Sequence, residues 1–177
     1  MDIFRRIAEY RAESAKLAWS GTFRDYIELL RQDPSPAMTA HARVYEMIVS
    51  HGVEEVDGRK RYKFFEQEIF GLDRTIEKLV EEYFHSAAKR LDVRKRILLL
   101  MGPVSGGKST IVTMLKRGLE KFSRTPKGAV YAIKGCPMHE EPLHLIPHEL
   151  RPEVERELGV RIEGNLCPSC QLMVKTE

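Results

Sequence analysis

Apolar residues recur at helical spacing along the first third of the chain. One stripe follows the spacing i, i+3, i+4, i+7 and is formed by Phe23, Tyr26, Ile27 and Leu30. A second stripe is formed by Ala40, Val44, Met47 and Ile48. Stripes of this kind are most often packing surfaces, so we predict two amphipathic helices. They belong to a small helical arm, residues 1–60, which ends at a turn at Asp57-Gly58 and a short strand.

The strongest helical pattern in the chain covers residues 71–90. Its apolar positions lie on one helical face and are Leu72, Ile76, Leu79, Val80 and Tyr83. Asp73 stands near the start of this segment, and Lys89 and Arg90 stand near its end. These charges complement the helix dipole, so the segment is predicted to be a helix that packs against the main domain.

The segments that follow have the pattern of a strand, a helix and a second strand. The apolar run at 96–102 predicts a buried strand, and the segment 128–135, which glycines bracket, predicts another. The helix between them has its inward positions at Ile111, Met114, Leu115, Leu119 and Phe122. A βαβ unit requires a parallel sheet flanked by helices. We therefore predict an α/β domain over residues 61–177, incomplete at its carboxyl side and ending in a loop-rich tail with one helix at 147–158.

Composition and charge exclude several classes of protein. A net charge of +3 gives no argument for nucleic-acid binding, and no apolar run approaches the roughly 20 residues of a membrane span. The first residues are charged and lack the apolar core of a signal peptide, so the expected location is the cytoplasm. Three cysteines in a reducing compartment are not expected to form structural disulfides and need another explanation.

A glycine-rich motif lies between the first predicted strand and the helix after it. The residues match the pattern G-x-x-x-x-G-K-[ST] of a P-loop and are Gly102, Pro103, Val104, Ser105, Gly106, Gly107, Lys108 and Ser109. Glycines let successive backbone amides curl around a phosphate group, where side chains would obstruct it. The helix that follows adds its positive amino-terminal end. This context indicates a nucleotide-binding site.

Three side chains of the motif have distinct expected roles. Lys108 can reach the β- and γ-phosphates, and the hydroxyl of Ser109 can ligate Mg²⁺. Thr110 is placed to contact the region of the α-phosphate. A P-loop enzyme also needs an acidic residue at the end of another apolar strand, and no such pattern follows Lys108. We therefore expect this sequence to be a fragment without its catalytic acid, whose identity is unknown.

The cysteines lie in two short motifs with a spacing typical of metal ligands. Cys136 with His139, and Cys167 with Cys170, form two pairs with two residues between their members. Together they would supply three sulfurs and one nitrogen to a tetrahedral Zn²⁺ site. Two alternatives stay open: a redox pair at Cys167 and Cys170, or buried thiols and turn residues without a ligand. His144 and His148 could also act as ligands, although a solvated histidine is the more ordinary interpretation.

Three segments together resemble the amino-terminal AAA+ region of the PrkA family, bacterial proteins described as serine protein kinases. These segments cover residues 69–90, 98–110 and 134–147, and the last, "KGCPMHEEPLHLIP", makes the resemblance specific. In AAA+ proteins a glycine-containing loop before the first helix packs over adenine, and Ile69, Phe70 and Gly71 match that position.

The resemblance also implies a function and partners. It implies ATP and Mg²⁺ as ligands, a protein substrate, a cytoplasmic protein, and assembly into rings or dimers. It further implies a longer parent protein, so kinase activity, a Walker B acid and an arginine finger cannot be carried over to residues of this chain. Family members are also linked to ATP-dependent proteolysis, so a protease, remodelling or regulatory ATP-driven module remains the alternative to a serine/threonine protein kinase.

Overall fold

The computed structural model describes residues 2–16, 18–89, 98–103 and 106–176. Contacts within the described chain divide it into two units. One unit is continuous and covers Thr39–Phe122, and the other combines Met1–Met38 with Ser123–Glu177. The sequence-based division at residue 60 falls inside a strand of the first unit, and the division into residues 1–60 and 61–177 stays a prediction.

The continuous unit consists of helices around a short antiparallel hairpin. Its helical elements are α3 (Ala40–Ser50), α4 (Asp73–Lys78), the π-helical segment η2 (Leu79–His85), α5 (Ser86–Ala88) and α6 (Lys108–Phe122). The strands β1 (Val53–Val56) and β2 (Arg59–Tyr62) pair with Val56 opposite Arg59. Asp57 and Gly58 between them both have positive φ, which a two-residue hairpin turn of type I′ requires. The turn predicted at these two residues is confirmed.

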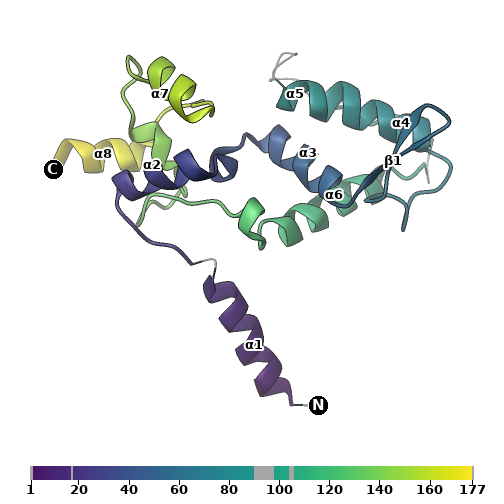
Figure 1. Ribbon diagram of the computed structural model, residues 1–177, viewed down its shortest axis with the longest axis horizontal. Helices are drawn as coiled ribbons and strands as arrows, with labels where there is room; N and C mark the ends of the chain where they lie inside the picture. Colours follow the sequence, from purple (N-terminus) through teal and green to yellow (C-terminus); the bar gives the residue numbers. More distant parts are fainter. Residues whose placement is uncertain (1, 17, 90–97, 104–105, 177) are drawn as a thin grey trace. The chain divides into compact units, whose positions relative to one another are not determined.

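The core of this unit is formed by the apolar faces that the sequence indicates. α3 packs against both α6 and η2, and Figure 1 shows these helices side by side. Met47 and Ile48 of α3 are fully buried, and most of the inward positions predicted on the other two helices are buried. The buried residues of this cluster are Met47, Ile48, Tyr62, Phe64, Phe65, Ile76, Leu79, Val80, Phe84, Ile111, Met114 and Phe122.

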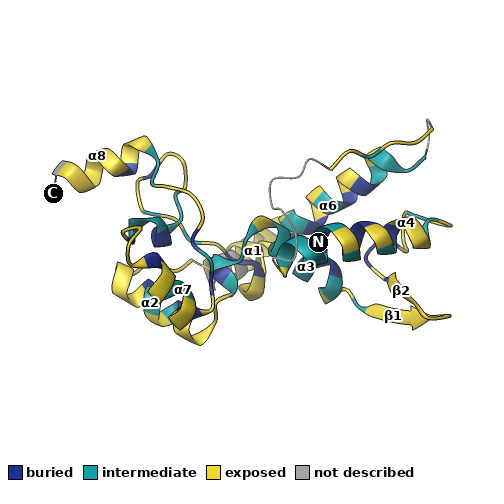
Figure 2. Cartoon of the chain, turned by 90° about the horizontal axis from the view of Figure 1, so that it is seen from above, coloured by how far each residue is buried: buried dark blue, intermediate teal, exposed yellow. Residues whose placement is uncertain are grey.

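The second unit consists of short helices and long connections. Its elements are α1 (Ile3–Lys16), α2 (Phe23–Gln32), η1 (Ser35–Ala37), η3 (Pro126–Gly128), η4 (Pro142–Leu145), α7 (Arg151–Leu158) and α8 (Pro168–Thr176). Tyr26 and Leu30 of α2 are buried in its core with Leu143 of η4 and Leu158 of α7. In Figure 2 the dark buried residues of α2 and α7 alternate with yellow exposed ones, as expected for amphipathic helices.

A buried arginine forms hydrogen bonds with the connecting segments of this unit. Arg151 is 7% exposed, and its guanidinium group donates hydrogen bonds to three backbone carbonyl groups. The acceptors are the oxygens of Ile146 at 3.0 Å, Gly164 at 2.7 Å and His144 at 3.4 Å. Loop carbonyls that lack a strand or helix partner are satisfied in this way, which allows irregular backbone to pack closely.

The predicted parallel sheet is not confirmed among the described residues, whose strands are β1 and β2 in an antiparallel pair. Residues 96 and 97 lie outside the described part, and residues 98–101 form no strand there. Leu99 and Met101 are 73% and 82% exposed, so the run is not buried as expected. The segment 128–135 also forms no ladder. A parallel strand exists only by hydrogen bonding to a neighbouring strand, and the described residues supply none to either segment.

Within the described ranges, no helix has both the length and the apolar character that a membrane crossing demands.

Candidate functional site

The glycine-rich motif forms a turn that leads directly into α6. Gly107 has φ +74°, a conformation that side chains rarely adopt, and α6 begins at the next residue. The amide of Gly106 donates a hydrogen bond to the carbonyl oxygen of Pro103 at 3.2 Å, which closes the turn. A Cβ at Gly106 would lie 3.0 Å from that same oxygen, so a side chain there would crowd the turn. Val104 and Ser105 lie outside the described residues.

The start of α6 presents positive charge and hydrogen-bond donors. The first amides of a helix have no partner one turn earlier, and the helix dipole adds partial positive charge at the same end. The ammonium group of Lys108 folds back over the loop and donates hydrogen bonds to the carbonyl oxygens of Gly102, at 2.9 Å, and Pro103. The side chains of Ser109 and Thr110 come next on the first turn. This arrangement can bind an anionic group at the helix end.

A cavity of about 600 Å³ opens at this helix end. Its lining includes residues of the two segments that the sequence assigned separately to phosphate and to adenine. The lining residues are Glu68, Ile69, Phe70, Leu72, Gly106, Gly107, Lys108, Ser109 and Thr110. The volume lies within the range of roughly 300–1,000 Å³ usual for sites that bind small molecules. Phe70 is 81% exposed, so a flat aromatic surface is available beside the helix end.

Two lining residues were not selected from the sequence. Leu72 packs against Gly107, because a Cβ at Gly107 would lie 3.5 Å from its Cδ1 atom. Glu68 forms an ion pair with Arg117 of α6 at 3.7 Å. Neither residue matches a known motif, and only the fold brings them to the P-loop. Gly71, predicted with Ile69 and Phe70, has φ +71° and turns the chain toward α4 without lining the cavity.

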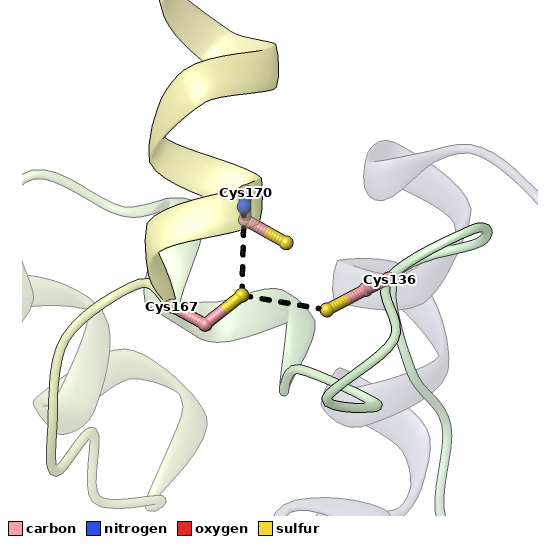
Figure 3. A group of neighbouring side chains, drawn as sticks. All are labelled: Cys136, Cys167 and Cys170. Carbon is pink, nitrogen blue, oxygen red and sulfur yellow. Dashed lines mark hydrogen bonds between the residues drawn. The ribbon is translucent and has the colours of Figure 1, made fainter.

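A second group of candidate site residues lies in the other unit. Cys136 stands in the loop before η4, and Cys167 and Cys170 stand at the start of α8. Figure 3 shows their three side chains pointing toward one another, and their sulfur atoms all lie within 4.8 Å. The Sγ atoms of Cys136 and Cys167 are 3.5 Å apart. All three cysteines are free, and Cys136 and Cys170 are buried.

The environment of the sulfurs differs from one cysteine to the next. Burial alone would raise the pKa of Cys136, but hydrogen bonds from the Glu140 backbone, the Cys170 side chain, the Met138 backbone and the Cys167 side chain together outweigh it and lower this pKa. Burial raises the pKa of Cys170 to about 12. The amide of Cys170 donates to the sulfur of Cys167 at 3.4 Å. Backbone donors thus point at two of the three sulfurs, an arrangement that favours thiolate ligands.

The structure brings together three of the four predicted zinc ligands, the cysteines, but not His139. His139 is exposed and is not a member of the converging group. Its φ of +50° and the hydrogen bond from its amide to the Cys136 carbonyl oxygen place it in a tight turn. His144 bonds to Glu140 and to the Glu163 carbonyl oxygen, both at 2.6 Å, so its ring nitrogens are already engaged.

Comparison with known proteins supplies the family. The model of the PrkA AAA domain matches residues 21–177. The chain is 65% identical over 168 residues to a Bacillus subtilis protein named ATP-dependent protease PrkA. The aligned region covers 95% of this chain and 27% of that relative. It is 61% identical over 97 residues to an uncharacterized Geobacillus stearothermophilus protein, covering 55% of this chain and all of that relative.

A more distant relative carries a different name. The chain is 33% identical over 105 residues to the serine/threonine kinase YeaG of Escherichia coli K12, covering 56% of this chain and 15% of that protein. No solved structure resembles the chain closely enough to count as a match. The chain thus spans about a quarter of the length of the Bacillus relative. Because the family model covers most of the chain, this protein belongs to the PrkA AAA domain family.

Proposed function

We propose that this chain is the ATP-binding AAA region of a PrkA-like serine/threonine protein kinase. The observation that carries the proposal is the shared cavity, which places Ile69 and Phe70 beside Lys108 at the start of α6. An aromatic and aliphatic surface next to a cationic helix end matches the two ends of a nucleotide, a flat base and a charged phosphate chain.

Each residue of the site has a role in this proposal. The amides around Gly106 and Gly107 and the start of α6 would bind phosphate oxygens, and the Lys108 ammonium would exchange its carbonyl partners for the β- and γ-phosphates. Ser109 would hold Mg²⁺, which neutralises phosphate charge when it is bound. Ile69 and Phe70 would pack on the adenine ring.

The expected parallel sheet is part of the same proposal. Leu99 and Met101 expose apolar side chains just before the P-loop, as the last strand residues of such a sheet would before pairing. A cytoplasmic location, a protein substrate and assembly into dimers or rings also stay proposals.

The names of the relatives support two activities for the whole protein. The distant relative is named as a kinase, and the more similar Bacillus relative is named as an ATP-dependent protease. The protease name favours, as a second candidate, an ATP-driven protease, remodelling or regulatory module without kinase activity. Radioactive γ-phosphate transfer to serine in a protein substrate, set against ATP-dependent peptide release from the same substrate by the intact protein, separates the two.

Lys108→Ala in the intact protein tests the ATP site. Loss of one charge-assisted hydrogen-bonding group is expected to weaken binding of ATP with Mg²⁺ by roughly 10- to 150-fold, measured by calorimetry. Lys116→Ala is the matched control, because Lys116 is exposed on the same helix and does not line the cavity. Unchanged far-ultraviolet dichroism would show that both variants are folded. Normal ATP affinity in the folded Lys108→Ala protein would refute the P-loop assignment.

A further inference from the structure

The three cysteines form a cluster whose geometry suits a metal ion. A tetrahedral Zn²⁺ ion with Zn–S bonds of about 2.3 Å places its sulfur ligands about 3.8 Å apart. The sulfurs of Cys136 and Cys167 are 3.5 Å apart, and none of the three distances exceeds 4.8 Å. Small rotations of the side chains would therefore bring all three into bonding distance of one ion.

The ligands come from segments that are distant in sequence. Cys136 and Cys167 are separated by 31 positions, Cys167 directly precedes α8, and Cys170 lies on the first turn of that helix. The rest of α8 contributes little to the core, because Leu172 and Val174 are 65% and 54% exposed. An ion bound by all three sulfurs would attach α8 to the loop before η4 where apolar packing is weak.

Backbone and side-chain hydrogen bonds hold the ligands in position. The Glu140 carboxylate accepts a hydrogen bond from the amide of Cys167 at 2.6 Å, and its other oxygen contacts His144 at 2.6 Å. Amides also point at the sulfurs of Cys136 and Cys167. Such supporting bonds orient the ligands of metal sites and stabilise the thiolate charge.

We propose that Cys136, Cys167 and Cys170 bind one Zn²⁺ ion through three thiolates, with the fourth position taken by water, and that this ion anchors α8. Each thiol loses its proton to solvent on binding, so no oxidant is needed. His139 is not a ligand, since its ring lies outside the converging group. This site lies outside the ATP cavity and does not depend on the proposed function.

Metal analysis of the intact protein, purified without added metal, tests the proposal. We expect one zinc per chain in the wild type and in His139→Ala. Cys167→Ser and Cys170→Ser should contain little zinc. Ser169→Ala is the matched control, because Ser169 lies between the two cysteines of α8 and is exposed, and it should keep its zinc. Clearly substoichiometric zinc in the wild type, or full zinc in Cys167→Ser, would overturn the proposal.

A second measurement covers the case in which the cysteine variants fail to fold. Wild-type protein is stripped with a chelator and titrated with Co²⁺, and strong thiolate-to-cobalt absorption with tetrahedral visible bands is expected. Binding of Co²⁺ without thiolate absorption would contradict the assignment, as would a disulfide between Cys136 and Cys167 under reducing conditions. Loss of zinc from His139→Ala would refute the three-thiolate ligand set.

Discussion

Gly118 lies in the middle of α6, where helix propensity and tertiary packing predict opposite effects of alanine. In an isolated helix, replacing glycine by alanine stabilises the helix by about 1 kcal/mol. In this fold Gly118 is buried, and a Cβ would lie 2.7 Å from Sδ of Met47 and 2.7 Å from Cε2 of Phe64. Met47 is fully buried, so neither neighbour moves away without disturbing the core.

The net effect of Gly118→Ala on stability is the balance of helix propensity and core packing. Overpacking of a well-packed core lowers the free energy of unfolding by about 1–3 kcal/mol, and the higher helix propensity of alanine raises it by about 1 kcal/mol. Because two side chains are crowded at once, we expect a net loss of about 1–2 kcal/mol in the free energy of unfolding, measured by urea denaturation. The same mutation in a Phe64→Leu background should cost less, because the ring atoms that Cβ meets are gone.

The control for this prediction is Thr113→Ala, on an exposed position of the same helix. This variant gains helix propensity without crowding the core, so its free energy of unfolding should rise by up to about 0.7 kcal/mol. Two results would refute the close packing of Gly118 in α6 against α3 and Phe64. One is a Gly118→Ala protein more stable than the wild type, and the other is a loss of stability that Phe64→Leu leaves unchanged.

Two further predictions concern polar groups. Glu81→Gln should destabilise the protein by about 1–2 kcal/mol at neutral pH, because Tyr62 and Lys60 donate to this carboxylate. Burial tends to raise the pKa of Glu81, but these hydrogen bonds outweigh it and lower the pKa, so the difference from the wild type should shrink as pH falls below about 4 in urea titrations. Arg151→Met should cost about 2–4 kcal/mol by leaving buried carbonyl oxygens without donors, whereas thermal unfolding of the exposed control Arg156→Met should stay close to the wild type. An equally stable Arg151→Met would show that water replaces the guanidinium group.

Several elements could be predicted from the sequence because they depend on neighbouring residues alone. The turn at Asp57-Gly58 follows from two residues that tolerate positive φ. The inward face of α6 follows from apolar spacing, and Ile111, Met114 and Phe122 are buried as predicted. The glycine turn before Lys108 follows from a local motif whose conformation its own residues determine.

Other features required contacts that the local pattern does not contain. The strands expected at 96–102 and 128–135 had suitable apolar residues, but strand pairing is a non-local interaction that the described residues do not make. His139 had the spacing of a ligand, yet it is not a member of the group that the three sulfurs form. Arg151 looks like an ordinary helix residue in the sequence, and only its hydrogen bonds to the carbonyls of His144, Ile146 and Gly164 reveal why it is buried.

By itself, the sequence determined the helices of the core, the hairpin turn, the phosphate-binding motif and the presence of three soft ligands, since each is specified by short-range spacing and backbone preference. The tertiary structure decided which of these come together. It placed Glu68 and Leu72 at the P-loop, joined Ile69 and Phe70 to Lys108 in one cavity, and selected three sulfurs without His139. Those outcomes depend on how loops and helices distant in the chain pack, and spacing along one segment carries no information about that packing.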